Sequence, residues 1–317
     1  MTRFIQSLFL LIALTGCEMQ PPEPLRIGLN TWATYEFLYL ADKKGFFKDE
    51  NLDVKLIEFS SLFDAQRAYV RGQIDGLGTT VVDVLQMRDE SPRSLQIIQV
   101  MDYSNGADMI LSNAKIKNGK DLRGKKVGLE LASLGIYILA RGFDKFGLTL
   151  DDVQMKTMDQ ISLTDEFSKG EFDAIVTYAP MSIQLQRDTK ANTLFSTSEI
   201  PGEVVDVLAV DQTMIDSRPD DIKKLLRAYY RAVDYAQQNP DESYALMAER
   251  EGLTPQEFKE ALTNGIHLVT QAEQNDFFKQ GGKLETVVNM ADKIMREAGQ
   301  IKGADYRAET INTRFVK

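Results

Sequence analysis

Acids, hydroxyls and aromatic rings in this chain follow short apolar runs that are typical of buried strands. In open α/β sheets, ligands bind beyond the carboxyl ends of the strands, where loops turn into helices. The residues that this rule selects are Trp32, Tyr35, Ser60, Ser61, Thr79, Thr80, Asp102, Glu130, Ser133 and Tyr178. They predict a site for binding a small molecule, without a catalytic group.

Glu130 and Asp102 carry the prediction about the charge of the ligand. A carboxylate that faces a half-closed cleft is costly unless a positive group pairs with it. No arginine or lysine stands at these strand ends, where a strongly anionic ligand would need donors. We therefore expect a small polar solute, amine-bearing or zwitterionic, whose positive charge aromatic faces would attract by about 1–2 kcal/mol. The alternative is that Glu130 caps a helix or bridges to a lysine.

The other candidates also have structural alternatives. The four hydroxyl residues belong to the types preferred as helix N-caps, each worth about 1 kcal/mol. Capping and ligand contact can coincide, because a helix N-terminus offers free N–H groups. Trp32 would be a core residue in most proteins, but its position just after a strand favours a wall of the cleft. Tyr178 precedes Ala-Pro, and Pro180 forces the chain to turn there.

Composition excludes several classes of function. The 317 residues carry a formal net charge of −10, without a basic stripe, so a nucleic-acid partner is not expected. His267 is the only histidine and lies far from any recognisable nucleophile, and no G-x-S-x-G motif occurs. Cysteine–histidine catalysis and metal sites of the Cys/His kind lack their ligands. We expect no metal and no cofactor, and we interpret His267 as structural.

The single cysteine, Cys17, stands at the end of a secretory signal. Residues 1–6 carry one arginine and no acid, and residues 7–14 are almost all apolar. The run ends in Leu-Thr-Gly-Cys, which resembles the lipobox of bacterial lipoproteins. That resemblance implies cleavage after residue 16, acylation of Cys17 and a lipid anchor in the membrane. Residues 17–24 then form a short stalk. An ordinary signal peptide with an incidental cysteine is the alternative.

From Leu25 onward, apolar runs alternate with amphipathic stretches, as in α/β proteins with mostly parallel sheets. The strands we expect cover 25–30, 52–59, 74–79, 94–101, 107–113, 125–130, 153–158, 172–178, 193–200 and 204–210. The helices we expect cover 35–47, 62–72, 80–87, 134–147, 163–170 and 180–188, and the chain is nearly all helical after 220. The pattern restarts near residue 118, which indicates two α/β lobes without a long linker.

Several phrases together resemble one family. "IGLNTWATYEFLYLADKKGFFKDENLDVKLIEF", "VRGQIDGLGTTVVDVL", "NGKDLRGKKVGLE" and "KGEFDAIVTYAP" are similar to the solute-binding proteins of ABC importers. The branch is the one that includes the nitrate, sulfonate, taurine and thiamine-precursor receptors. The resemblance implies a type II periplasmic-binding-protein fold, with lobe 1 at 25–103 and 204–317 and lobe 2 at 104–203.

The resemblance also implies a function. A monomeric, lipid-anchored receptor outside the cytoplasm would close over a small solute and deliver it to an ABC permease. Asp108, Glu199 and Asp206 fall where the lobes would join, and we interpret Asp108 as a hinge residue rather than a ligand contact. One alternative is a sensor of the same fold that reports to a membrane signalling protein. Another is an enzyme of precursor synthesis, as in some relatives of the thiamine-precursor group.

Overall fold

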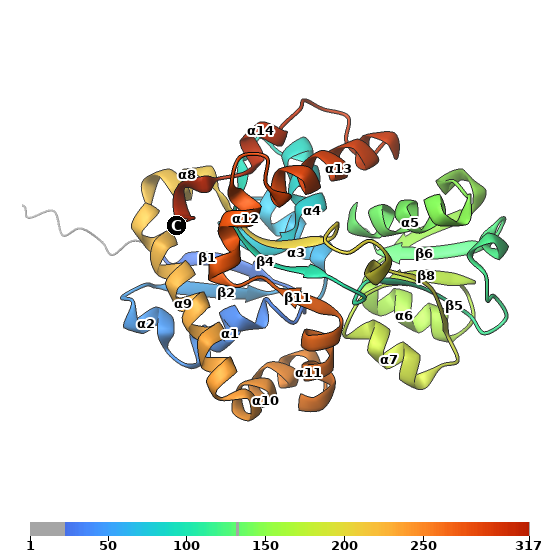
Figure 1. The fold of residues 1–317 in the computed structure, drawn as a ribbon, viewed down its shortest axis with the longest axis horizontal. Helices are drawn as coiled ribbons and strands as arrows, with labels where there is room; N and C mark the ends of the chain where they lie inside the picture. Colours follow the sequence, from blue (N-terminus) through green and yellow to red (C-terminus); the bar gives the residue numbers. More distant parts are fainter. Residues whose placement is uncertain (1–22, 131–132, 317) are drawn as a thin grey trace, which may run out of the picture.

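The chain folds around two separate β-sheets, which lie side by side in Figure 1. The structure, a computed structural model, describes residues 23–130 and 133–316. The expected signal segment and Cys17 lie outside the described residues. We call the part built on the larger sheet the six-stranded lobe, and the part built on the smaller sheet the five-stranded lobe.

The six-stranded sheet has the order β11-β4-β10-β3-β1-β2, and the five-stranded sheet the order β7-β6-β8-β5-β9. The strands of the first are β1 (Leu25–Leu29), β2 (Val54–Glu58), β3 (Gly76–Thr80), β4 (Leu95–Ser104), β10 (Val205–Asp211) and β11 (Ile266–Leu268). Those of the second are β5 (Met109–Ser112), β6 (Lys126–Glu130), β7 (Gln154–Met158), β8 (Ala174–Thr177) and β9 (Asn192–Ser196). The ten expected strands are present. β11 escaped prediction because three residues are too few to show a period.

The sheets are mixed, so the expectation of mostly parallel sheets was wrong. β1 runs parallel to β2 and β3, and β6 runs parallel to β7 and β8. β10 is antiparallel to β3 and β4, and β5 is antiparallel to β8 and β9. The cause is that β5 and β10 are the strands on which the chain crosses from one sheet to the other. Alternation of apolar runs does not show the direction of a strand.

Helices cover both faces of each sheet, as Figure 1 shows for α5 on one side of the five-stranded sheet and α6 and α7 on the other. These three are α5 (Ser133–Phe146), α6 (Gln160–Ser168) and α7 (Met181–Asp188). The six-stranded lobe contains α1 (Glu36–Lys43), α2 (Phe46–Asp49), α3 (Leu62–Val70), α4 (Val81–Glu90), α8 (Gln212–Ser217), α9 (Pro219–Gln238), α10 (Pro240–Glu251), α11 (Pro255–Asn264), α12 (Gln274–Phe278), α13 (Lys283–Glu297) and α14 (Arg307–Thr310). None of the helices in the described parts of the chain is long and apolar enough to cross a membrane.

Alternate residues of the crossing strand β10 enter two different cores. Val207 and Ala209 belong to the core with α3, α4 and α13, whereas Leu208 and Val210 belong to the core with α1 and α9. This is the period of two that a strand covered on both faces requires. The first of these cores continues into the other lobe, because α5 packs against α4 and α13. The two lobes therefore form one packed body on that side.

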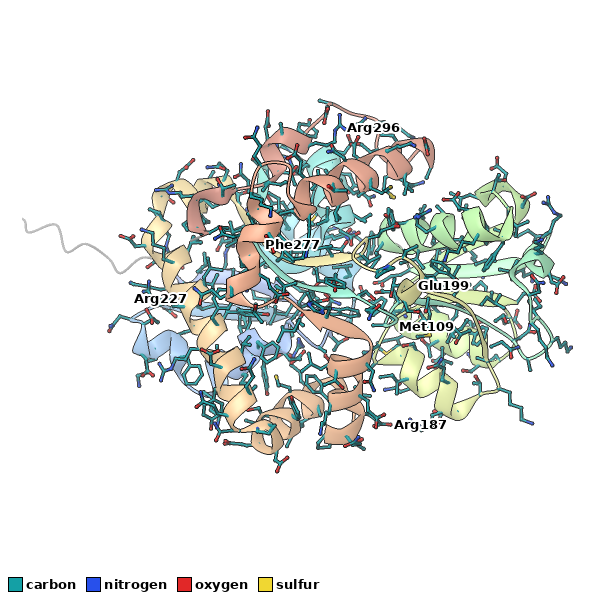
Figure 2. The ribbon with its side chains drawn as sticks, viewed as in Figure 1. Met109, Arg187, Glu199, Arg227, Phe277 and Arg296 are labelled. Carbon is teal, nitrogen blue, oxygen red and sulfur yellow. The ribbon has the colours of Figure 1, made fainter. Side chains whose placement is uncertain are left out.

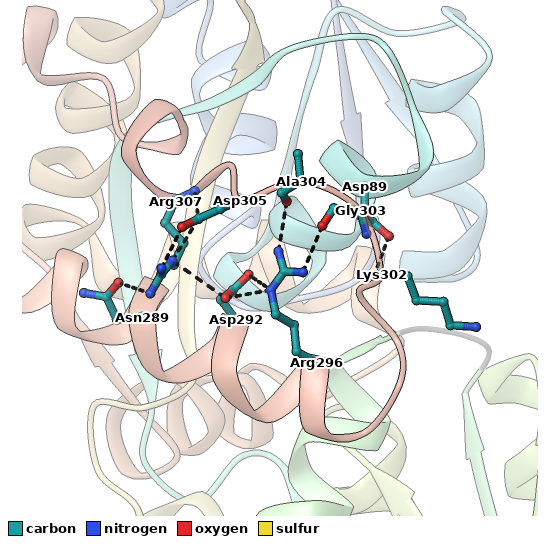
Figure 3. A network of polar contacts seen from close by, with 9 residues as sticks. All are labelled: Asp89, Asn289, Asp292, Arg296, Lys302, Gly303, Ala304, Asp305 and Arg307. Atoms are coloured by element: carbon teal, nitrogen blue, oxygen red, sulfur yellow. Dashed lines mark hydrogen bonds and ion pairs between the residues drawn. The ribbon is translucent and has the colours of Figure 1, made fainter.

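A polar network fastens the C-terminal segment onto α4 and α13 (Figure 3). Arg296 Nε lies 3.0 Å from both carboxylate oxygens of Asp292, and its other nitrogens donate to the carbonyls of Gly303 and Ala304. Asp89 on α4 accepts from the backbone N–H groups of residues 302 and 303. Since Asp292 is buried, its carboxylate depends on the hydrogen bonds from Arg296 Nε.

We expect Asp292→Asn to lower the free energy of unfolding by about 1–2 kcal/mol, because it removes a charged acceptor from a partly buried pair. Urea unfolding of the two proteins measures the difference. Glu297→Gln is the matched control, since the Lys293–Glu297 pair on the same helix is exposed and should contribute little. Equal losses for both variants would contradict a special role for Asp292.

Candidate functional site

A cavity lies between the two sheets, where strands of both lobes end. Its lining residues are Asn30, Trp32, Tyr35, Leu62, Thr80, Asp108, Leu134, Tyr178 and Asp206. The space between them is about 10 Å³, which is close to the room that one water molecule needs. The cavity therefore takes a single water-sized chemical group between the lobes as they stand.

Two aromatic rings from opposite lobes meet beside the cavity. Trp32 follows β1 and Tyr178 follows β8, and their ring centroids are 6.1 Å apart in an edge-to-face arrangement of 71°. Trp32 Nε1 donates to Asp102 Oδ2 at 3.0 Å, and the Tyr178 hydroxyl donates to Glu130 Oε2 at 2.8 Å. Each ring is thus held by a buried carboxyl group of its own lobe.

Carboxyl groups lie next to each other where the crossing strand begins. Asp206 on β10 pairs in register with Asp102 on β4 on one side and with Thr80 on β3 on the other. The Tyr35 hydroxyl donates to Asp206 Oδ1 at 2.5 Å, and Thr34 donates to Asp102. The remaining oxygens of the two residues, Asp102 Oδ1 and Asp206 Oδ2, are buried and have no hydrogen-bond partner in the described structure.

Two further acids lie near the cavity, one in the segment between β4 and β5 and one at the end of β6. Asp108 follows β4, its backbone N–H donates to Ser104 Oγ, and its Oδ2 atom has no hydrogen-bond partner. Glu130 ends β6, and the N–H of Phe63 at the start of α3 lies 3.5 Å from its Oε1 atom. Glu130 therefore also links the two lobes, although the contact to Phe63 is long.

Burial raises the pKa values of the carboxyl groups around the cavity. Desolvation raises the pKa of Asp102, of Asp108 and of Glu130 to about 7 in each case. Desolvation also raises the pKa of Asp206 well above its ordinary value, and the neighbouring Asp102 raises it further. None of the residues that line the cavity in the described structure is a lysine, arginine or histidine. Shifts of this kind are common at functional sites.

The structure brings some of the predicted residues to the cavity and places others behind it. Trp32, Tyr35, Thr80 and Tyr178 line the cavity. Asp102 and Glu130 lie behind it and hold Trp32 and Tyr178. Thr80 also caps α4, and Ser61 caps α3 by accepting from the N–H of Asp64. Ser60 is exposed, Thr79 is fully buried, and Ser133 is the first residue of α5.

Three acceptors that line the cavity are absent from the ten predicted ligand contacts. Asn30 follows β1, Asp108 was interpreted as a hinge residue, and Asp206 was placed where the lobes would join. A signal for Asp206 is present in the sequence, because one acid interrupts the apolar run Val204–Leu208. Acids are rarely fully buried without a partner, so such an interruption favours a site.

His267 lies away from the cavity. It is on the short edge strand β11, about half exposed, and its ring stacks on Tyr103 with centroids 4.6 Å apart. Glu273 lies 3.3 Å from its Nε2 atom. Within residues 23–130 and 133–316, no group of three or more His, Cys, Asp or Glu side chains is arranged to hold a metal ion.

A salt bridge joins the lobes outside the cavity. Arg187 on α7 lies 2.8 Å from Glu257 on α11, at the place where Figure 2 labels Arg187. The arginine is about half exposed, so the pair contributes at most about 1 kcal/mol. This ion pair by itself therefore holds the two lobes together only weakly.

Comparison with known proteins identifies the family. The sequence model described as NMT1/THI5 like matches residues 32–243, so the chain belongs to this family. A protein of Brucella abortus named as a binding protein is 23% identical over 235 residues, which are 71% of each chain. The 4-amino-5-hydroxymethyl-2-methylpyrimidine phosphate synthase of Aspergillus parasiticus is 24% identical over 224 residues, 64% of this chain and 63% of the synthase.

A solved structure identifies the fold. The alkanesulfonate-binding protein SsuA of Xanthomonas axonopodis pv. citri, bound to MOPS, superposes with a TM-score of 0.75 at 16% identity. The match covers 92% of this chain and 99% of SsuA. The chain thus has the type II periplasmic-binding-protein fold with two α/β lobes. This confirms the fold and the family that the sequence phrases indicated.

The raised pKa of Asp108 predicts how stability depends on pH. The folded protein binds the proton more tightly than the unfolded chain, so this group lowers the free energy of unfolding as pH rises from about 4 to about 7. The loss is at most on the order of 4 kcal/mol. We expect Asp108→Asn to gain stability relative to the wild type over that range, measured by urea unfolding at several pH values.

Asp42→Asn is the control, because it removes the same charge from an exposed position on α1. Its unfolding curve should follow the wild type at every pH. If Asp108→Asn behaved in the same way as this control, the carboxyl group of Asp108 would not be buried in solution.

Proposed function

We propose that this NMT1/THI5-like protein is an extracytoplasmic receptor that captures a small organic cation between its lobes and delivers it to an ABC permease. One observation carries the choice of solute: buried carboxyl groups surround a cavity whose lining contains no basic side chain in the described structure. A bound cation would compensate the charge of these groups, which burial otherwise makes costly.

The same observation argues against an anionic solute. Sulfonates and similar anions need several N–H donors, commonly from arginine. SsuA of Xanthomonas axonopodis pv. citri is named for alkanesulfonates, but the cavity here presents Asp108 and Asp206 instead of donors. A shared fold does not imply a shared ligand, since ligand chemistry depends on the residues of the site.

Capture would proceed by closure of the lobes. The cavity has room for one water-sized group, so a whole solute must enter while Trp32 and Tyr178 are apart. The solute would then add contacts between the lobes to the packing of α5 against α4 and α13, to the long Glu130–Phe63 contact and to the exposed Arg187–Glu257 pair. Binding energy would thereby favour the closed arrangement.

The signal segment and Cys17 support a place outside the cytoplasm, with the protein anchored by lipid. An anchor would raise the receptor's effective concentration near a membrane partner. A sensor of the same fold would use the same cavity and anchor, with a signalling protein as its partner. Genes for a permease and an ATPase beside this one would favour import.

An enzymatic function is the second candidate, because the relative in Aspergillus parasiticus is named as a pyrimidine phosphate synthase. The only histidine of the chain stacks on Tyr103 instead of lining the cavity. Proton transfer in the cavity would therefore have to use a carboxyl group, Asp108 or Asp206, rather than an imidazole. Chemical change of a bound solute, followed by mass spectrometry, would favour the enzyme.

A thermal-shift screen of the domain from residue 18 tests the proposal, after refolding to remove bound solute. The solutes would be amines, amino acids, polyamines, pyrimidines, sulfonates and nitrate. We expect cations to stabilise the protein, by about 2.7 kcal/mol at 100 times Kd. Glu130→Gln should weaken cation binding about tenfold, because it removes a negative charge beside Tyr178.

Asp42→Asn again controls for net charge and should leave the affinity unchanged. Stabilisation by sulfonates or nitrate alone would mean that helix N-termini dominate the site, and the cation proposal would be abandoned.

A further inference from the structure

Three acceptor oxygens around the cavity have no hydrogen-bond partner. They are Asn30 Oδ1, Asp108 Oδ2 and Asp206 Oδ2, and all three residues line the cavity. Each of these residues is 3% exposed, so solvent does not replace the missing partner. Buried polar atoms are rarely left in this state, because each costs about 1–3 kcal/mol.

The donors nearby are already engaged. The Tyr35 hydroxyl donates to Asp206 Oδ1, which leaves Oδ2 of the same carboxyl group without a partner. Asn30 uses its Nδ2 atom to donate to the carbonyl of Thr31 at 3.2 Å, which leaves Oδ1 as an acceptor. The Thr80 hydroxyl donates to Asp83 Oδ2 at 2.6 Å. The ligand must therefore supply the missing donors.

We propose that the cavity is a subsite for the head group of a primary amine, R–NH₃⁺, with one N–H directed to each of Asn30, Asp108 and Asp206. This inference rests on the proposed function and specifies the chemical group that the site recognises. An ammonium group carries three donors and no acceptor, which matches three acceptors without a free donor. Two of the acceptors are carboxyl groups, so the hydrogen bonds are charge-assisted.

The size of the cavity also favours an ammonium head group. About 10 Å³ is available, which is room for one water-sized group. An ammonium head group is of that size, whereas a trimethylammonium group adds three methyl groups and removes all three donors. The rings of Trp32 and Tyr178 and the side chains of Leu62 and Leu134 form the apolar part of the lining. They would lie against the carbon atoms next to the nitrogen.

Asp102 has a different part in this arrangement. It is fully buried, does not line the cavity, and accepts from Trp32 and Thr34. It is therefore a positioning residue that fixes the Trp32 ring and lies beside Asp206. The ligand contacts belong to Asp108 and Asp206, which the sequence placed at the hinge.

A matched series of cations tests the subsite. Benzylamine, N-methylbenzylamine, N,N-dimethylbenzylamine and benzyltrimethylammonium share one ring and one positive charge at neutral pH, and they offer three, two, one and no N–H donors. Benzyl alcohol is the uncharged blank. Calorimetric titration of the refolded protein should show affinity that falls at each step, with at least a tenfold difference between the ends of the series.

Asp108→Asn should weaken benzylamine at least tenfold and reduce the difference between benzylamine and benzyltrimethylammonium. Asp42→Asn, which changes an exposed acid, should leave all four affinities as in the wild type. Circular dichroism of each variant establishes that it is folded before titration.

The outcomes separate this inference from the proposed function. Equal affinity for all four cations would overturn the three-donor subsite and leave a receptor for organic cations. Tighter binding of benzyltrimethylammonium, or no binding of benzylamine, would overturn the subsite as well. Binding of benzyl alcohol and of sulfonates without any of the cations would overturn both proposals.

Discussion

The burial of adjacent carboxyl groups at the crossing strands is the constraint on which the site depends. Asp206 and Asp102 occupy opposed positions of β10 and β4, and both are removed from water. Two neighbouring buried carboxylates cannot both ionise without a large penalty, so a proton or a cation must accompany them. Tyr35, Thr34 and Trp32 supply hydrogen bonds, but none of these residues supplies a positive charge.

Packing around this pair leaves little freedom. A Cβ atom added at Gly78 would lie 2.8 Å from the ring of Tyr35, so only glycine lets that ring lie against β3. The ring in turn brings its hydroxyl to Asp206. Gly78 of β3 thus leaves room for the Tyr35 ring. The Tyr35 hydroxyl then occupies Oδ1 of Asp206, so Oδ2 stays available. The lining comes from two strand residues, Thr80 and Asp206, and from residues that follow strands or begin helices.

Family and chemistry give different kinds of information about this chain. The NMT1/THI5-like match and the superposition on SsuA establish a two-lobed fold, whose relatives include proteins named as binding proteins and as synthases. They do not decide the ligand, because fold is compatible with many ligands. Two acids, Asp108 and Asp206, line the described cavity without a basic residue, and such a lining is unfavourable for an anion such as an alkanesulfonate.

The sequence by itself determined where the strands and helices lie, that they form two α/β lobes, and that acidic residues are expected at the site. Apolar periodicity is local, so ten strands and the helix α3 could be predicted from it. Only the tertiary structure decided which acids converge. Asp108 and Asp206 are distant in sequence, and they meet because the chain crosses between the sheets twice. Strand order and register depend on such long-range pairing, which no local pattern encodes.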